Sequence, residues 1–302
     1  LTKFFKLPLK GILRQTIFGK FCGGESINDS LSVIKDLKYQ GISTVLDYAV
    51  EAKTKENEFD KVMEEILRAV AFAAKEPSIS FCVFKISAIT GPDVLERMSR
   101  AFDHTHDEEW LKLKSRIFRI CGSAMVHNVR IFIDAEESWI QPAIDLLAEE
   151  AMETFNQKKA VVFHTIQLYR KDKLEYLKKL VKHAREHDYY PGFKLVRGAY
   201  LEKENHRAIE KGYTSPIHIS KENTDKDYND AISFCVENHN IVSFCIGTHN
   251  EESINELVFL MNQHKIHKGN PQIFCIQLYG MGDHITYKMA SLGYNASKYL
   301  PY

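Results

Sequence analysis

The stretch Lys194-Leu195-Val196-Arg197-Gly198-Ala199-Tyr200 is an apolar strand that ends in a cation, a glycine and an aromatic residue. Two further apolar runs end in a comparable way. The run 241–246 leads into Gly247-Thr248-His249-Asn250, and the run 273–276 leads into Gln277-Leu278-Tyr279-Gly280. Barrel and open α/β enzymes build their sites from polar side chains at the carboxyl ends of several strands. The three stretches therefore predict an α/β fold whose site lies at its strand ends.

Strand-like and helix-like segments alternate along the chain. Apolar residues at i, i+3, i+4, i+7, i+8 and i+11 predict a helix over 56–72. Strands are predicted at 43–50, 78–87, 130–134, 160–167, 193–198, 216–220, 241–247 and 273–278; the weak segment 216–220 is included because the spacing leaves room for one strand there. This order predicts an α/β fold, a (βα)8 TIM-like barrel over 41–302, preceded by a helical arm over 1–40. A doubly wound sheet is the alternative, but no GxGxxG motif follows a strand.

Composition narrows the classes of partner. The chain has 40 basic and 40 acidic residues, so no net field favours nucleic acid or an anionic membrane. Its six cysteines show no CxxC spacing, which indicates an intracellular, reducing compartment and argues against a disulfide framework or a zinc site. No apolar run approaches the ~20 residues that span a bilayer. The basic, aromatic segment 4–21 favours a packed helix over a membrane-surface helix.

Two charged residues interrupt neighbouring apolar strands. Lys85 lies within Phe84-Lys85-Ile86-Ser87, and Asp134 ends the following strand. Side chains at equivalent heights can meet, because adjacent strands lie about 4.8 Å apart. One interpretation is a structural ion pair that sets the register of the barrel, since a buried lysine needs a carboxylate partner. The other is a functional pair that faces a substrate.

A polar cluster follows Gly247. Thr248, His249 and Asn250 precede a helix that is predicted to begin near Glu251. Hydroxyl, imidazole and amide groups beside a helix N-terminus form an anion site suited to a pyrophosphate, although they could equally cap the helix. A metal-binding role for His249 is a third interpretation, but no second histidine lies at ligand spacing, so no metal is predicted.

Together these motifs resemble the proline dehydrogenase family, in family order, from Leu46-Asp47-Tyr48-Ala49-Val50-Glu51 to the last residue. The resemblance implies a monofunctional flavoprotein that binds FAD and oxidises L-proline to Δ1-pyrroline-5-carboxylate. It also implies that electrons pass to a quinone. The corresponding location is the bacterial cytoplasm with a peripheral membrane contact, or the mitochondrion of a eukaryote.

The resemblance further implies roles for individual residues. Lys85 and Asp134 match the catalytic lysine and aspartate of the substrate pocket. The proline is expected to contact Lys85, Tyr200, Leu278, Tyr299 and Glu51. The FAD is expected to contact Gln167, Lys194, Val196, Arg197, Gly198, Ala199, Thr224, Thr248, His249 and Asn250.

Several of these roles have a chemical reason. The cation of Lys194 would stabilise an anionic reduced flavin, and Gly198 has no side chain to hold the ring away. Walls formed by Tyr200, Leu278 and Tyr299 would exclude water. Relatives that oxidise hydroxyproline tend to carry a smaller residue where this chain has Tyr299, so its bulk favours proline.

Family members continue beyond Tyr299-Leu300-Pro301-Tyr302 into a helix whose arginine pair grips the proline carboxylate. In the family, the glutamate that matches Glu51 pairs with an arginine of that helix. We therefore expect the barrel as written to be distorted at its last helix. We also expect it to bind FAD but to oxidise proline poorly until the helix is supplied.

Two other functions stay open at the level of sequence. A metal-dependent barrel lyase or hydrolase would use Asp134, His249 and Glu51, and it would be colourless and sensitive to chelators. A flavin-binding barrel without turnover would be yellow but inactive. An absorption spectrum separates the first of these from the flavoproteins.

Overall fold

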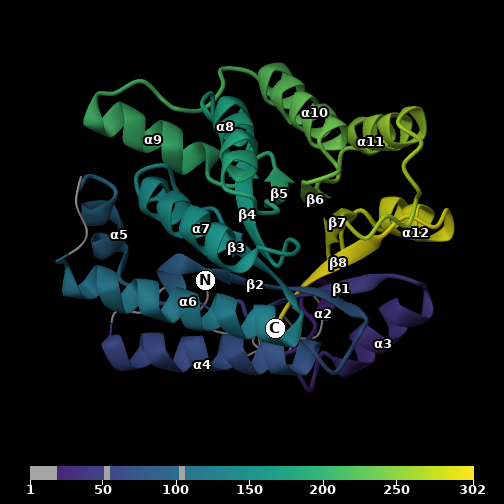
Figure 1. Ribbon diagram of the computed structural model, residues 1–302, viewed down its shortest axis with the longest axis horizontal. Helices are drawn as coiled ribbons and strands as arrows, with labels where there is room; N and C mark the ends of the chain where they lie inside the picture. The colour runs from purple at the N-terminus through teal and green to yellow at the C-terminus, as the bar shows by residue number, and fades with distance from the viewer. Residues whose placement is uncertain (1–18, 51–54, 102–105) are drawn as a thin grey trace, which may run out of the picture.

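A computed structural model describes residues 19–50, 55–101 and 106–302, which form a closed parallel β-barrel with helices around it (Figure 1). Neighbouring strands in the ring follow the order of the chain, and the last strand pairs with the first. The strands are β1 Ser43–Asp47, β2 Ile79–Lys85, β3 Arg130–Asp134, β4 Val162–Gln167, β5 Gly192–Val196, β6 Ser243–Gly247, β7 Ile273–Leu278 and β8 Ala296–Pro301. The predicted (βα)8 barrel is confirmed.

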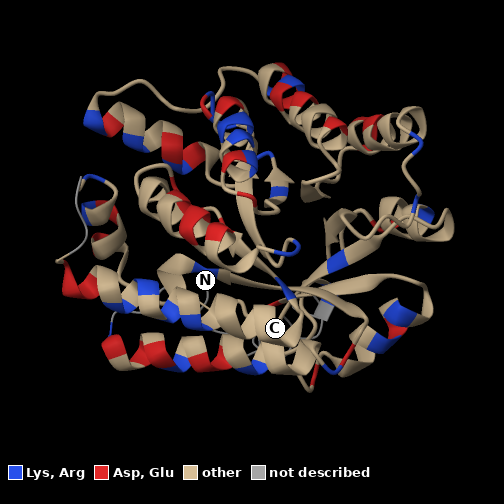
Figure 2. Ribbon diagram, viewed as in Figure 1, with Lys and Arg blue, Asp and Glu red and all other residues tan. Residues whose placement is uncertain are grey.

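The helices surround the strands as a ring in Figure 1. They are α2 Gly19–Phe21, α3 Leu31–Tyr39, α4 Glu56–Ala73, the short 3-10 turn η2 Ile86–Ala88, α5 Pro92–Met98, α6 Glu108–His127, α7 Gln141–Phe155, α8 Lys173–Glu186, α9 Leu201–Lys211, α10 Lys221–Glu237, α11 Glu251–Gln263 and α12 Asp283–Ser291. Figure 2 shows both signs of charge interspersed along the outer helices, as the equal numbers of basic and acidic residues suggest.

The expected strand at 216–220 is wrong. In that segment only Ile217 makes an isolated antiparallel bridge, with Arg170. Pro216 has no backbone N–H to give to a ladder, which disfavours a central strand. The eighth strand is instead β8, which closes the ring between β7 and β1. Its pattern is hard to recognise because Lys298, a charged residue, stands in its middle.

The core has an inner and an outer part. Inside the barrel, Phe81 and Phe132 stack at 4.2 Å between ring centroids, and the edge of Phe81 meets Phe163 at 5.2 Å and Phe274 at 5.0 Å. Such aromatic pairs fill the interior and exclude water from it. Outside, apolar stripes of the helices cover the strands; the stripe of α4 is the one that its sequence predicts. Polar groups are therefore directed to the two ends of the barrel.

The expected helical arm at 1–40 falls partly on residues 1–18, which lie outside the described residues, as does Glu51. Of the described part, α3 buries Ile34 and Leu37, and the amide of Gly23 donates to the carbonyl oxygen of Pro301 at 2.8 Å. Within residues 19–50, 55–101 and 106–302, no helix combines the length and the apolar character that crossing a bilayer requires.

Candidate active site

The carboxylate of Asp134, at the end of β3, is the centre of a polar group above the aromatic interior. It forms an ion pair with Lys194 of β5 and accepts hydrogen bonds from the hydroxyls of Thr165 at 3.2 Å and Tyr299 at 2.8 Å. The Lys194 side chain is only 7% exposed, and its ammonium nitrogen lies 4.9 Å from the centroid of the Tyr299 ring. Strands β3, β4, β5 and β8 thus place one buried, charge-neutral network at their carboxyl ends.

The structure gives Lys85 a different environment from Lys194. Lys85 ends β2 and is paired in register with Asp134, as expected from the sequence. Its side chain is nevertheless exposed, and the ion pair with Asp134 is made by Lys194 instead. The structural ion pair considered for Lys85 is therefore wrong, because Lys194 of β5 is the lysine that pairs with Asp134. Lys85 is left at the rim of the barrel, where its charge can meet a ligand.

Asp47, at the end of β1, was not among the predicted site residues. Burial raises the pKa of its carboxyl to about 7; the charge of Asp134 adds to this rise, and Lys85 and Lys194 oppose it. Asp47 and Lys85 both line a cavity of about 250 Å³ beside β1 and β2. Asp47 is the last residue of β1, as Asp134 is of β3. This position could have identified Asp47 from the sequence.

Two tyrosines of the predicted substrate wall keep their protons. Burial, followed by the charge of Asp134, raises the pKa of Tyr299 well above its usual range. Burial and the nearby Glu136 raise the pKa of Tyr200. The Tyr299 hydroxyl therefore acts as a donor toward Asp134. Leu278, the third residue of the expected wall, ends β7 and is partly exposed.

Gln167 joins the site to the loop after β3. Its side-chain amide donates to the carbonyl oxygen of Glu136 at 2.7 Å. The carboxylate of Glu136 accepts in turn from the amide of Ser87 at 2.9 Å and from the Ser87 hydroxyl. Burial raises the pKa of Glu136, and the hydrogen bonds from Ser87 oppose that rise. The ends of β2, β3 and β4 are thereby held together.

Arg197 organises a second polar cluster at the ends of β5 and β6. Its guanidinium donates to Asp225 at 2.6 Å, to the Thr248 hydroxyl at 2.8 Å and to the Ser253 hydroxyl at 3.0 Å, and it stacks 4.3 Å from the Tyr228 ring. The first turns of α10 and α11 are thus joined to β5. Asp225 also pairs with Lys221, so two cations share one carboxylate beside two helix N-termini, a favourable place for an anion.

The predicted triplet at the start of α11 has mixed roles. Asn250 caps the helix, because its side-chain oxygen accepts from the amide of Ser253 at 3.0 Å. His249 is exposed, and burial followed by the charge of Lys298 lowers the pKa of its imidazole. Gln277, which was not among the predicted site residues, donates to the carbonyl oxygen of Thr248 at 3.0 Å. Both the capping and the anion-binding interpretations of this cluster therefore fit its geometry.

The backbone after β5 is open where the sequence predicts a cofactor. Gly198 and Ala199 are exposed, and Val196 is half-buried. Gly198 has a φ of +142°, and a Cβ there would lie 2.4 Å from the Tyr169 ring. A side chain at this position is excluded by the protein itself. Thr224 is buried in the first turn of α10, and its hydroxyl donates to the Ser220 carbonyl oxygen at 3.4 Å.

Among the described residues, the side chains that could together hold a metal ion are Glu153, His183 and His187. They lie at the last turns of α7 and α8, which lead back toward the amino ends of the strands. His249, the candidate considered from the sequence, is not part of this cluster.

The closed barrel and the polar side chains at its strand ends together define a (βα)8-barrel protein whose candidate site lies at the carboxyl face of the barrel. The sequence profile of the family described as proline dehydrogenase matches residues 30–302. The chain belongs to the proline dehydrogenase family. This agrees with the resemblance found in the motifs.

Individual relatives support the assignment. The chain is 35% identical to the carbapenem antibiotics biosynthesis protein CarD of Pectobacterium carotovorum subsp. carotovorum, over 97% of this chain and 76% of the relative. It is 31% identical to mitochondrial proline dehydrogenase 2 of Arabidopsis thaliana, over 96% of this chain and 71% of the relative. A crystal structure of proline utilization A from Bdellovibrio bacteriovorus, inactivated by N-propargylglycine, matches with a TM-score of 0.86 at 22% identity, which speaks for the fold alone.

The extent of these matches differs between relatives. The match to the Bdellovibrio structure includes 97% of this chain but only 32% of the Bdellovibrio chain. The match to mitochondrial proline dehydrogenase 1 of Dictyostelium discoideum covers 59% of that protein. The barrel is thus shared with longer proteins.

Proposed function

We propose that this chain oxidises L-proline to Δ1-pyrroline-5-carboxylate with FAD as its cofactor. The observation that supports this most directly is the buried group of Asp134, Lys194 and Tyr299 beside the open backbone of Gly198. A cation, a carboxylate and an aromatic wall meet there at one face of the barrel. Family membership supplies the reaction class.

The residues present fit an FAD. Gly198 and Ala199 offer exposed backbone without bulky side chains. Gln167 and Lys194 are buried and already donate to Glu136 and Asp134, so their part would be to hold the strand ends beside the cofactor in place. The positive cluster of Arg197 and Thr248 suits a pyrophosphate, because it lies at two helix N-termini. When bound, FAD accepts a hydride from the substrate.

The side chains of the chain would orient proline and exclude water. The exposed ammonium of Lys85 is placed to attract the substrate carboxylate. Asp134 holds the Tyr299 ring in position through the hydrogen bond at 2.8 Å, and Tyr200 and Leu278 would complete the wall. Proline that binds with its amine deprotonated needs no strong base. Asp47, with a pKa of about 7, is a candidate to exchange a proton near neutral pH.

The purified protein is expected to be yellow, with flavin absorption bands that bleach under dithionite in one sample and under proline in another. Lys85→Ala should lower proline turnover while the flavin stays bound, because Lys85 is exposed and the ion pair with Asp134 is made by Lys194. A correctly folded, colourless protein that does not take up added FAD would contradict the proposal. Unchanged kcat/KM in Lys85→Ala would place Lys85 outside substrate binding.

The electron acceptor and the membrane contact are further parts of the proposal. We infer a quinone acceptor and a peripheral membrane contact from the family resemblance, and no nucleic-acid partner from the balanced charge. Reduction of a soluble quinone by proline, measured with and without anionic vesicles, tests both points. A rate that vesicles leave unchanged, together with no co-sedimentation, would remove the membrane contact.

A further inference from the structure

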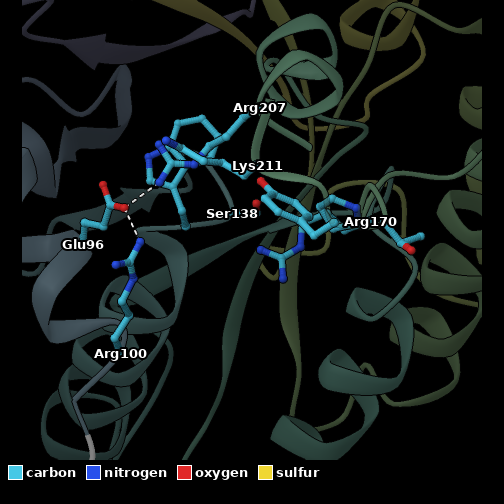
Figure 3. A pocket seen from close by; sticks show the side chains of 10 residues that line it. Glu96, Arg100, Ser138, Arg170, Arg207 and Lys211 are labelled. Carbon is cyan, nitrogen blue, oxygen red and sulfur yellow. Dashed lines mark hydrogen bonds and ion pairs between the residues drawn. The ribbon is translucent and has the colours of Figure 1, made fainter. Parts of the chain in front are cut away.

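A cationic cleft of about 790 Å³ lies beside the barrel, separate from the strand-end site (Figure 3). It is formed by α5, α9 and the loops after β3, β4 and α9, and its lining residues are Glu96, Arg100, Ser138, Trp139, Arg170, Arg207, Lys211, Tyr213, Thr214 and Pro216. Four of these carry a positive charge and one carries a negative charge. Figure 3 places Lys211 and Ser138 between the Glu96–Arg100 pair and Arg170.

The single carboxylate is already shared. One oxygen of Glu96 accepts from the guanidinium groups of both Arg100 and Arg207. Lys211 forms an ion pair with Glu210 at 3.5 Å, and this exposed pair is weak. The cleft therefore keeps an excess of positive charge after its internal pairs are counted.

Arg170 supplies an unfulfilled donor. Its Nε and Nη2 donate to the two carboxylate oxygens of Asp172 at 3.0 and 2.8 Å. Its Nη1 is buried and has no hydrogen-bond partner within the part of the chain that the structure describes, and the whole residue is only 8% exposed. An unpaired buried N–H costs free energy, so this atom is suited to an acceptor supplied by a ligand.

Besides the polar Ser138 and Thr214, the rest of the lining is aromatic or apolar. The Arg207 guanidinium lies 4.2 Å from the Trp139 ring centroid, and Tyr213 and Pro216 line the same cleft. A volume of about 790 Å³ is within the range of small-molecule sites. Guanidinium groups match phosphate oxygens in a bidentate manner, and several cations together favour a multiply charged group over a single carboxylate.

We propose that this cleft binds a small phosphorylated anion of the nucleotide class. Arg170 Nη1, Arg207 and Lys211 hold its phosphate oxygens, and its ring lies against the aromatic residues. The site is distinct from the Arg197–Thr248 cluster of β5 and β6, and the proposal does not depend on the proposed oxidation of proline.

The test titrates ADP and, separately, inorganic pyrophosphate into FAD-saturated protein by calorimetry, with Trp139 fluorescence as a second signal. Saturating FAD keeps ADP from the strand-end site. Arg170→Met and Lys211→Met should each weaken binding of both probes about tenfold, the expected loss for one charge-assisted hydrogen bond. Lys226→Met removes an exposed lysine of α10 outside the cleft and should leave both affinities unchanged.

The outcomes separate the alternatives. Tighter binding of ADP than of pyrophosphate supports the nucleotide class, and equal binding overturns the role of the ring. Citrate that binds as tightly as pyrophosphate overturns the preference for phosphate. Absence of saturable binding, or affinities unchanged in Lys211→Met, overturns the site itself. Lys211 is exposed, so this variant decides the matter even where Arg170→Met does not fold.

Discussion

At the residue scale, the two oxygens of Asp134 serve three partners: Lys194, Thr165 and Tyr299. Removing one member of a buried ion pair leaves the other charged and uncompensated, which is worse than losing both. A structural role for Asp134 and the proposed role at the site are therefore not alternatives. One carboxylate can serve both, because it neutralises the buried Lys194 at the strand ends.

Asp134→Asn should lower the free energy of unfolding by about 3–5 kcal/mol, because it leaves the Lys194 charge buried without a counter-ion. Denaturant unfolding of the flavin-free protein measures this. The matched control is Asp230→Asn, which breaks an exposed i,i+4 pair with Lys226 and should cost below about 1 kcal/mol. Equal losses of unfolding free energy in the two variants would show that water reaches Lys194 and solvates its charge.

Asp47 predicts a pH dependence of stability. Its pKa is raised from 3.8 to about 7 by folding, so the folded state binds the proton more tightly than the unfolded state. The stabilisation is complete below about pH 4 and is lost as the pH rises to about 7. Asp47→Asn should therefore flatten the fall of unfolding free energy over this window, by up to about 1.4 kcal/mol per pH unit.

The control for this measurement is Asp36→Asn, at an exposed position of α3, which should leave the slope as in the unsubstituted protein. Glu136, whose pKa is also raised, contributes to the slope in all three proteins. An Asp47→Asn slope identical to that of the unsubstituted protein would mean that Asp47 is hydrated.

At the element scale, the loop between β7 and α12 joins β8 to the N-terminal helix α2. Lys298 of β8 is 1% exposed and donates to the carbonyl oxygens of Leu278 at 3.3 Å and Met281 at 2.5 Å. A Cβ at Gly280 would lie 2.1 Å from the carbonyl oxygen of Lys20 in α2. The loop is thus held from two sides, and we propose that the described part of the arm packs on the barrel.

Gly280→Ala should destabilise the protein more than Gly293→Ala does. Both glycines have positive φ, +74° and +86°, so both substitutions carry the left-handed strain of about 1–2 kcal/mol. Nothing lies within 4 Å of a Cβ at Gly293, whereas the Cβ at Gly280 meets backbone. The difference between the two unfolding free energies isolates the contact with α2. Equal losses of unfolding free energy would show that α2 moves away from Gly280 at no cost.

At the scale of the whole molecule, we expect bound FAD to stabilise the barrel, because the proposed site is formed by side chains from most of the strands. Strands β3, β4, β5, β6 and β8 contribute side chains, and β8 closes the ring on β1. Binding to the folded state alone adds RT ln(1 + [L]/Kd) to its stability, about 2.7 kcal/mol at a hundredfold excess over Kd. Binding at the strand ends should therefore raise the free energy of unfolding of the whole barrel.

Addition of FAD should raise the thermal midpoint of the flavin-free protein, and FMN at equal concentration should raise it less, because FMN lacks the pyrophosphate expected at Arg197 and Thr248. Differential scanning calorimetry gives both midpoints. An Arg197→Gln variant in which FAD and FMN act alike would support the location of the pyrophosphate. A midpoint that neither ligand moves would count against a flavin site.

The sequence by itself determined the barrel, the alternation of seven of its strands with helices, and the strand ends at which polar residues gather. These features depend on local periodicity and on the rule that parallel strands end at one face, and both can be read from neighbours in the chain. The assignment to the proline dehydrogenase family rests on the same motifs and is confirmed by the profile match over residues 30–302.

Only the tertiary structure decided which lysine pairs with Asp134, which segment closes the ring, and that the carboxyl of Asp47 is buried with a raised pKa. Lys85 and Lys194 are alike as charges within apolar strands. Which of them reaches Asp134 depends on side-chain direction across the barrel, between residues 60 positions apart for the pair that forms. The pKa of a carboxyl and the closure by β8 likewise depend on distant neighbours, which no local pattern contains.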